Sequence, residues 1–223
     1  MTPISRRRLT CTACLRPQSA CICRWVTPVV HQVEVLILQH PLEVDNPKGS
    51  ARLLHLSLPG SRLVTGEVFD DLPALLADSP DHRGASGSEK LNLLLYPETP
   101  QNQPPGSSPG QLAPGALDDP ARLRLVVLDG TWRKSLKMLY ANPLLQQLPR
   151  LALQDVGASH YLIRKAHRPD QLSTLEATCA ALAQLQGGAG PLQPLLAAFD
   201  GFVAQQMGYR NLRGNGSAQT PDY

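Results

Sequence analysis

The chain has 223 residues and a formal net charge of +3. This length suits one α/β domain with a small appendage, whereas two full domains would be cramped. The weak positive charge permits a nucleic-acid partner without requiring one. No stretch is apolar over the length needed to span a bilayer, and no hydrophobic segment follows Arg6-Arg7-Arg8. We therefore expect a soluble cytoplasmic protein without a membrane partner.

Four of the five cysteines are clustered near the N-terminus. In a chain without a secretion signal, such a cluster is more typical of a metal or redox site than of a disulfide framework. The spacings can close a tetrahedral zinc site, whereas thiol chemistry would need only one Cys-x-x-Cys pair. The predicted ligands of a structural zinc ion are Cys11, Cys14, Cys21 and Cys23. The segment would either cap the domain or present Arg16, Arg24 and Trp25 to nucleic acid.

Strands and helices are predicted to alternate along the chain. Apolar runs predict strands at residues 33–38, 61–65, 91–96, 123–128 and 151–153, with a further extended piece at 159–164. Apolar residues at helical spacing predict helices at 51–58, at 72–77, from Trp132 to a break at Pro143, from Ser173 onward, and at 192–207. This alternation predicts an α/β fold with a mainly parallel sheet flanked by helices.

Composition divides the chain into three parts. We expect a zinc-binding segment at residues 1–28, an α/β domain at 29–208 and a disordered polar tail at 209–223. Residues 99–120 are rich in proline, glycine, serine and glutamine and predict a flexible insertion within the domain. Residues 80–88 form a second predicted loose loop.

The most informative stretch runs from Arg122 to Lys137, where a buried strand breaks into a helix at Asp129-Gly130. Ligands of parallel α/β sheets bind at the carboxyl ends of strands, beside helix N-termini. The aspartate could simply cap the next helix. However, Arg133 and Lys134 lie in the first helical turn, where cations oppose the helix dipole, and this favours a docked anion such as a phosphate backbone. Asp129 could then act as a general base or orient a substrate N–H group.

Other candidate residues allow two interpretations. Trp132 is either the first core contact of its helix or a stacking surface for a base or an adenine ring. His40 is predicted to be a hydrogen-bonding residue at a strand end, and Glu43 is predicted to be solvated. Arg164 could clamp a phosphate or a carboxylate.

A capping box formed by Ser173 and Glu176 predicts the start of a helix, and Cys179 lies on the apolar stripe of that helix. Cys179 is therefore predicted to be a core residue. The sequence contains neither Gly-x-Gly-x-x-Gly nor a P-loop, and no Ser-His-Asp order or histidine pair indicates hydrolysis.

Taken together, these motifs resemble the DTW-domain family, the tRNA-uridine aminocarboxypropyltransferases, in its bacterial type. The likeness extends from about Cys11 to Met207 and rests on six motifs in order. They are Cys11-x-x-Cys14-x-Arg16-Pro17-x3-Cys21-x-Cys23, Gln39-His40-Pro41-x-Glu43, Tyr96-Pro97, Asp129-Gly130-Thr131-Trp132, Ser159-x-Tyr161-x-x-Arg164 and Leu172-Ser173-Thr174-x-Glu176-Ala177.

The resemblance implies a fold related to the SPOUT methyltransferases, with a deep backbone knot. It also implies that S-adenosylmethionine donates its 3-amino-3-carboxypropyl group to N3 of a tRNA uridine and leaves as methylthioadenosine. Asp129 would deprotonate N3 or hold the imide. The implied cofactor contacts are Gln39, Pro97, Gly130, Thr131, Trp132 and Ser173. The implied tRNA contacts are Arg133, Lys134, Arg164 and Lys165.

Two other functions remain open: a SPOUT-type RNA methyltransferase that uses the same co-substrate, and a catalytically silent, zinc-dependent RNA-binding protein. DNA is not expected as a partner. The chain departs from the family pattern in two places. The insertion at 99–120 is longer and looser than expected, and Ser50 stands where a threonine is expected, which keeps the hydroxyl group.

Overall fold

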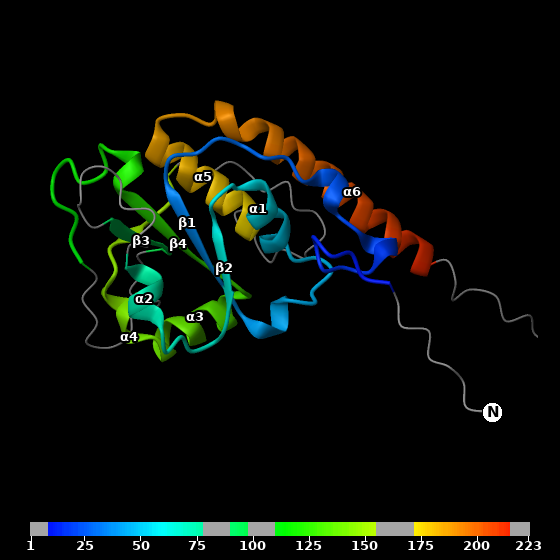
Figure 1. The fold of residues 1–223 in the computed structure, drawn as a ribbon, viewed down its shortest axis with the longest axis horizontal. Helices are drawn as coiled ribbons and strands as arrows, with labels where there is room; N and C mark the ends of the chain where they lie inside the picture. Colours follow the sequence, from blue (N-terminus) through cyan, green and yellow to red (C-terminus); the bar gives the residue numbers. More distant parts are fainter. Residues whose placement is uncertain (1–8, 78–89, 98–109, 155–171, 215–223) are drawn as a thin grey trace, which may run out of the picture.

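Parallel strands form a five-stranded sheet in the order β2-β1-β4-β3-β5 (Figure 1). The computed structural model describes residues 9–77, 90–97, 110–154 and 172–214. The strands are β1 (Glu34–Gln39), β2 (Arg62–Thr65), β3 (Leu91–Leu95), β4 (Leu123–Asp129) and β5 (Arg150–Leu151). Every strand pair is parallel, which confirms the predicted parallel sheet.

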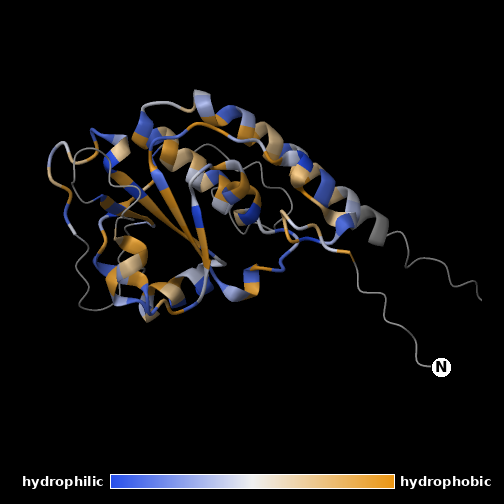
Figure 2. Ribbon diagram, in the orientation of Figure 1, coloured by the Kyte–Doolittle hydropathy of each residue, from blue (hydrophilic) through white to orange (hydrophobic). Residues whose placement is uncertain are grey.

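Helices cover both faces of the sheet (Figure 1). One face carries α1 (Ala51–Ser57), α5 (Thr174–Gln186) and α6 (Gln193–Gly214), and the other carries α2 (Leu72–Leu76), α3 (Trp132–Ala141) and α4 (Pro143–Gln147). Side chains alternate along each strand, so that Val35 and Ile37 of β1 enter one core and Leu36 and Leu38 enter the other. The central strands are accordingly hydrophobic along most of their length (Figure 2).

Most of the predicted elements lie within a few residues of their observed positions. Pro143 separates α3 from α4, as predicted. Cys179 is buried in the core, and Ser173 and Glu176 form the predicted capping box at the start of α5. The extended piece predicted at 159–164 and the loop at 80–88 lie outside the described residues.

The last helix is longer than predicted. A short 3-10 helix, η7 (Gly190–Leu192), leads into α6, which continues to Gly214, so the predicted tail boundary at 209 falls inside the helix. Tyr209 donates a hydrogen bond of 2.6 Å from Oη to the Ser19 carbonyl. This tertiary contact supports a polar turn that has no apolar periodicity of its own, which is why the sequence pattern missed it.

Part of the predicted insertion is attached to the fold. Of residues 99–120, the structure describes residues 110–120, and the Gly110 N–H donates to the Gln147 carbonyl at 2.9 Å. Leu117 packs against the core. None of the described helices combines the length and apolar character that crossing a bilayer requires.

Candidate functional site

The carboxyl ends of β1 and β4 form the point where the chain connections diverge. The connection after β1 runs through α1 on one face toward β2, whereas the connection after β4 begins with α3 and α4 on the opposite face. Ligands of open α/β sheets bind at such a point. The last residues paired across β1 and β4 are Gln39 and Asp129. Two polar side chains therefore meet where the topology favours a ligand.

Asp129 is held from two elements. Its side chain is buried, with 2% exposure. Gln39 Nε2 donates to Oδ2 at 2.9 Å, and Thr174 Oγ1 donates to Oδ1 at 2.6 Å. Thr174 is the first residue of α5, so the helix N-terminus reaches the end of β4. The carboxylate thus has a fixed orientation at the carboxyl edge of the sheet.

The helix after Asp129 is capped by another residue. Thr131 is the N-cap of α3, and its hydroxyl accepts a hydrogen bond from the Lys134 N–H at 3.4 Å. Gly130 is closely packed, because a Cβ atom there would lie 3.1 Å from Cβ of Lys134 and 3.8 Å from Cβ of His40. The capping interpretation of Asp129 therefore does not hold, and its carboxylate faces Gln39 and Thr174 instead.

The prediction that Glu43 is solvated is wrong. It ends a 3-10 helix, η3 (Pro41–Glu43), and is only 2% exposed. Its two oxygens accept from Lys134 Nζ at 2.7 Å and from Asn46 Nδ2 at 2.6 Å. The Lys134 cation, which we predicted to attract an external anion, has an internal partner in Glu43. Arg133, in the same helical turn, is exposed.

His40 is a hydrogen-bonding residue at a strand end, as predicted. Its Nδ1 accepts from the Leu42 N–H at 3.1 Å, so the ring proton resides on Nε2, which lies 2.9 Å from Oε2 of Glu67. Lys137 Nζ contacts the other Glu67 oxygen at 2.9 Å. Lys137 and His40 together lower the pKa of Glu67. His40 thereby ties the turn after β1 to the segment after β2.

Trp132 is not a core residue, because 52% of it is exposed. Its ring forms a T-shaped pair with that of Tyr96, with ring centroids 5.8 Å apart and ring planes at 76°. Tyr96 is buried directly after β3, and burial raises the pKa of its hydroxyl group. The guanidinium of Arg150 lies 5.3 Å from the Tyr96 ring centroid. An exposed indole held by this ring contact can stack a planar ligand.

The sequence-predicted site residues divide into three groups. Gln39 bonds to Asp129, Ser173 precedes Thr174, which also bonds to it, and Gly130 and Thr131 follow Asp129 in the chain. Pro97 follows Tyr96, the ring contact of Trp132. Arg133 and Lys134 lie in the first turn of α3. Arg164 and Lys165 lie outside the described residues. Sequence reasoning missed the role of Thr174, because its partner Asp129 is 45 positions away. The signal in the sequence is the position of Thr174 directly after the N-cap residue, where its hydroxyl can face the end of a strand.

The four N-terminal thiols gather into one cluster. Their sulfur atoms all lie within 4.8 Å of one another, with 3.5 Å between Cys11 and Cys23 and 3.7 Å between Cys14 and Cys21. Four ligands at about 2.3 Å from a tetrahedral zinc ion have sulfur atoms about 3.8 Å apart. Backbone N–H groups of Cys14 and Ala13 lower the pKa of Cys11 to about 6, and desolvation raises that of Cys23 to about 12. The arrangement fits a tetrahedral metal ion.

The four-cysteine segment, residues 9–26, is docked on the domain. Trp25 fills the space over Gly201 of α6, where a Cβ atom would lie 2.1 Å from the indole ring. Its Nε1 donates to Gln205 Oε1. Arg16 donates to the carbonyls of Pro47 and Gly49. Trp25 and Arg16 are therefore engaged within the protein, which favours the capping interpretation over their presentation to nucleic acid.

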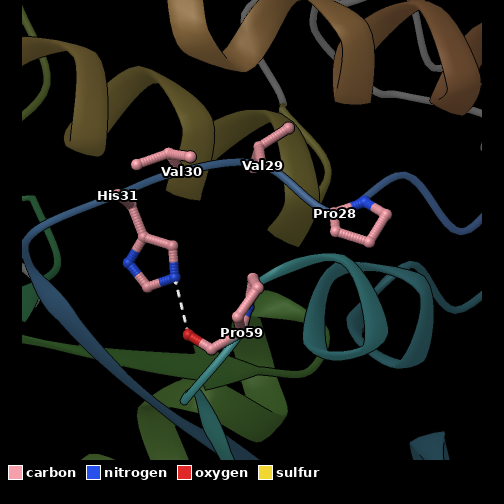
Figure 3. A pocket seen from close by; sticks show the side chains of 5 residues that line it. All are labelled: Pro28, Val29, Val30, His31 and Pro59. Atoms are coloured by element: carbon pink, nitrogen blue, oxygen red, sulfur yellow. Dashed lines mark hydrogen bonds between the residues drawn. The ribbon is translucent and has the colours of Figure 1, made fainter.

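A surface hollow lies elsewhere. It is lined by Pro28, Val29, Val30, His31 and Pro59, which precede β1 and β2 (Figure 3). His31 Nε2 pairs with the Pro59 carbonyl at 3.0 Å. This hollow is at the amino ends of the strands, opposite Asp129, and offers mainly apolar surface, so we do not assign the chemistry to it.

Known proteins are similar to this chain over most of its length. The tRNA-uridine aminocarboxypropyltransferase 2 of Drosophila melanogaster is 31% identical over 190 residues, which cover 81% of this chain and 68% of that protein. The proteins of that name from Macaca fascicularis and Mus musculus are 27% and 29% identical over 82% of this chain, which spans only 58% of each. No solved structure matches the chain significantly. The DTW domain profile matches residues 8–207, and the chain therefore belongs to the DTW-domain family.

Proposed function

We propose that the protein transfers the 3-amino-3-carboxypropyl group of S-adenosylmethionine to N3 of a tRNA uridine, with release of methylthioadenosine. The observation that carries this proposal is the buried Asp129 carboxylate, oriented by Gln39 and Thr174 where the sheet connections diverge. The relatives named tRNA-uridine aminocarboxypropyltransferase give the substrate class.

The chemistry requires a group that receives or orients the proton on N3. S-adenosylmethionine supplies a carbon bonded to a sulfonium, so that N3 forms a bond to that carbon as the carbon–sulfur bond breaks and its electron pair passes to sulfur. Gln39 and Thr174 bond to different oxygens of Asp129, and this fixes the plane of the carboxylate. Asp129 either accepts the N3 proton or holds the N–H group while the proton passes to solvent.

The residues around Asp129 suggest how the two substrates are held. We place S-adenosylmethionine against Gln39, Pro97, Gly130, Thr131, Trp132 and Ser173. The half-exposed Trp132 ring suits stacking on adenine or uracil. We place the tRNA backbone along Arg133, Lys134, Arg164 and Lys165. Because Lys134 is paired with Glu43, Arg133 is the better candidate of these two cations in the first turn of α3 for a direct phosphate contact.

The cysteine cluster would hold a structural zinc ion through Cys11, Cys14, Cys21 and Cys23. Zinc binding would supply folding energy to this small segment. We propose a zinc segment at 1–28 and a catalytic domain that begins at residue 29 and includes all of α6. The relation to SPOUT methyltransferases and the backbone knot stay predictions, since residues 155–171, between β5 and α5, lie outside the described residues.

One experiment separates the proposed function from its alternatives. Purified protein is incubated with S-adenosylmethionine and total tRNA, and methylthioadenosine and S-adenosylhomocysteine are measured together with the mass of the modified nucleoside. Methylthioadenosine with an aminocarboxypropyl-uridine supports the proposal. S-adenosylhomocysteine with a methylated nucleoside would show a methyltransferase. Binding of tRNA without either product would show a silent RNA-binding protein.

The matched pair of variants is Asp129→Asn and Asp119→Asn. Asp129→Asn keeps the shape of the side chain and removes its charge, so product formation is expected to fall by at least ~100-fold. Asp119 is exposed and caps the short 3-10 helix η6 (Pro120–Arg122), so its variant is expected to remain active. Equal activity of the two variants would remove Asp129 from the mechanism.

A further inference from the structure

Two side chains that donate to Asp129 within the described part of the chain, Gln39 and Thr174, are attached to the ends of one segment, residues 40–50. Gln39 immediately precedes this segment and donates to Asp129 Oδ2. At the other end, Ser50 is the N-cap of α1, and its Oγ accepts from the Leu175 N–H at 3.2 Å. Leu175 follows Thr174, which donates to Asp129 Oδ1. A shift of residues 40–50 would therefore disturb both contacts with the carboxylate.

The four-cysteine segment fixes residues 40–50 through Arg16. Its Nη1 donates to the Pro47 carbonyl at 2.7 Å, and its Nη2 donates to the Gly49 carbonyl at 2.8 Å. The backbone turns tightly here, because a Cβ atom on Gly49 would lie 3.2 Å from the Asn46 carbonyl oxygen. A planar guanidinium can bridge two carbonyls in a fixed geometry, which the single nitrogen of a lysine cannot reproduce.

Arg16 is itself held by its own segment and by α6. Its carbonyl accepts from the Cys11 N–H at 2.8 Å, and its guanidinium lies 5.4 Å from the ring centroid of Phe202 in α6. The preceding Leu15 has φ of 58°, a left-handed conformation that costs energy for a residue with a Cβ atom. This strained residue lies between Cys14 and Arg16 in the chain.

We propose that Arg16 is a positioning residue for Asp129, which acts through Gly49, Ser50 and the first turn of α5. The four-cysteine segment would then set the geometry of the site in addition to capping the domain. The kinetic part of this inference rests on the proposed function, but the structural part does not. Loss of Arg16 is expected to lower kcat by on the order of 10- to 100-fold with little change in the KM for tRNA, because misplaced catalytic groups slow the chemical step.

The variant is Arg16→Ala, and the matched control is Arg24→Ala. Arg24 lies in the same segment, is exposed, and stacks 4.7 Å from the Trp25 ring. Hydrogen exchange measured by mass spectrometry is expected to become faster for the first turn of α5 in Arg16→Ala and to stay unchanged for the last turn of α5. Arg24→Ala is expected to change neither turn nor kcat.

Each alternative outcome overturns the inference in a distinct way. If Arg16 contacts tRNA directly, its variant raises the KM for tRNA, leaves kcat unchanged and leaves the exchange of α5 unchanged. If Arg16 only stabilises its own segment, the variant loses bound zinc, and the protein molecules that retain zinc keep the wild-type kcat. Wild-type protein that forms no methylthioadenosine defeats the proposed function, and the exchange measurement still decides the coupling.

A second variant tests the same path without disturbing the four-cysteine segment, so that misfolding of this segment cannot explain its effect. Ser50→Ala removes the acceptor of the Leu175 N–H and touches no cysteine contact. It is expected to lower kcat and accelerate exchange in the first turn of α5, as Arg16→Ala does, while Ser50→Thr restores both. Wild-type kcat and exchange in Ser50→Ala would overturn the path from Arg16 to Asp129.

Discussion

The hydroxyl of Thr174 offers the sharpest test of the Asp129 site. Its Oγ1 lies 2.6 Å from Asp129 Oδ1, within the short range that is typical of a hydroxyl bound to a carboxylate. A hydrogen bond to a charged group contributes about 1.5–3 kcal/mol. If all of this contribution is lost from the transition state, Thr174→Val lowers kcat by about 10- to 150-fold. Valine keeps the shape of the side chain, so the fold should persist.

The assay is steady-state formation of methylthioadenosine with saturating tRNA and S-adenosylmethionine. Thr174→Ser keeps the hydroxyl and is expected to retain most of the activity. Thr178→Val is the control, because Thr178 Oγ1 donates within α5 to the Thr174 carbonyl at 2.7 Å and does not touch Asp129. A Thr174→Val enzyme with the wild-type kcat, or a Thr178→Val enzyme with the larger loss, would refute the assigned role of the hydroxyl.

Three further predictions concern stability and metal content. Desolvation opposes ionisation of Glu34, but its hydrogen bonds to Arg124 and the Arg124 charge hold the pKa of Glu34 at about 2. The ionised Glu34 therefore contributes its full stabilisation of the fold above about pH 4.5, and this stabilisation is lost as the pH falls toward 2. Urea unfolding should accordingly show Glu34→Gln destabilised by ~3 kcal/mol at neutral pH, with a smaller difference in acid. Cys14→Ser should lower the zinc content measured by mass spectrometry, together with Tm. Gly201→Ala should lower the unfolding free energy by about 1–3 kcal/mol or more, because its methyl group would overlap the Trp25 ring.

The sequence predicted those features that depend on neighbouring residues or on strand ends. Apolar runs predicted all five strands, and the local pattern at Ser173 predicted the capping box. Gln39 and Asp129 were both recognised as polar residues at strand ends, and parallel strands place such ends on one edge. Cysteine spacing alone predicted the cluster.

The features that the sequence did not predict depend on contacts between distant residues. Glu43 looked solvated because its partner Lys134 is 91 positions away in sequence. The Thr174 contact with Asp129 likewise spans 45 positions. Strand order is a property of how the helices pack, and hydrophobic periodicity carries no information about it. For these reasons the residue types of the site were predictable, whereas the partners that orient them were not.

The docking of the four-cysteine segment on α6 has a consequence for the order of folding. Trp25 meets Gln205 across 180 positions, and Tyr209 meets Ser19 across 190. At translation rates of about 5–20 residues per second, the docking surface follows the cysteines by roughly 10–40 s. Throughout that interval the thiols have emerged without their helical support. Early zinc capture would protect them from oxidation during synthesis, so metal supply at the ribosome should influence the yield of folded protein.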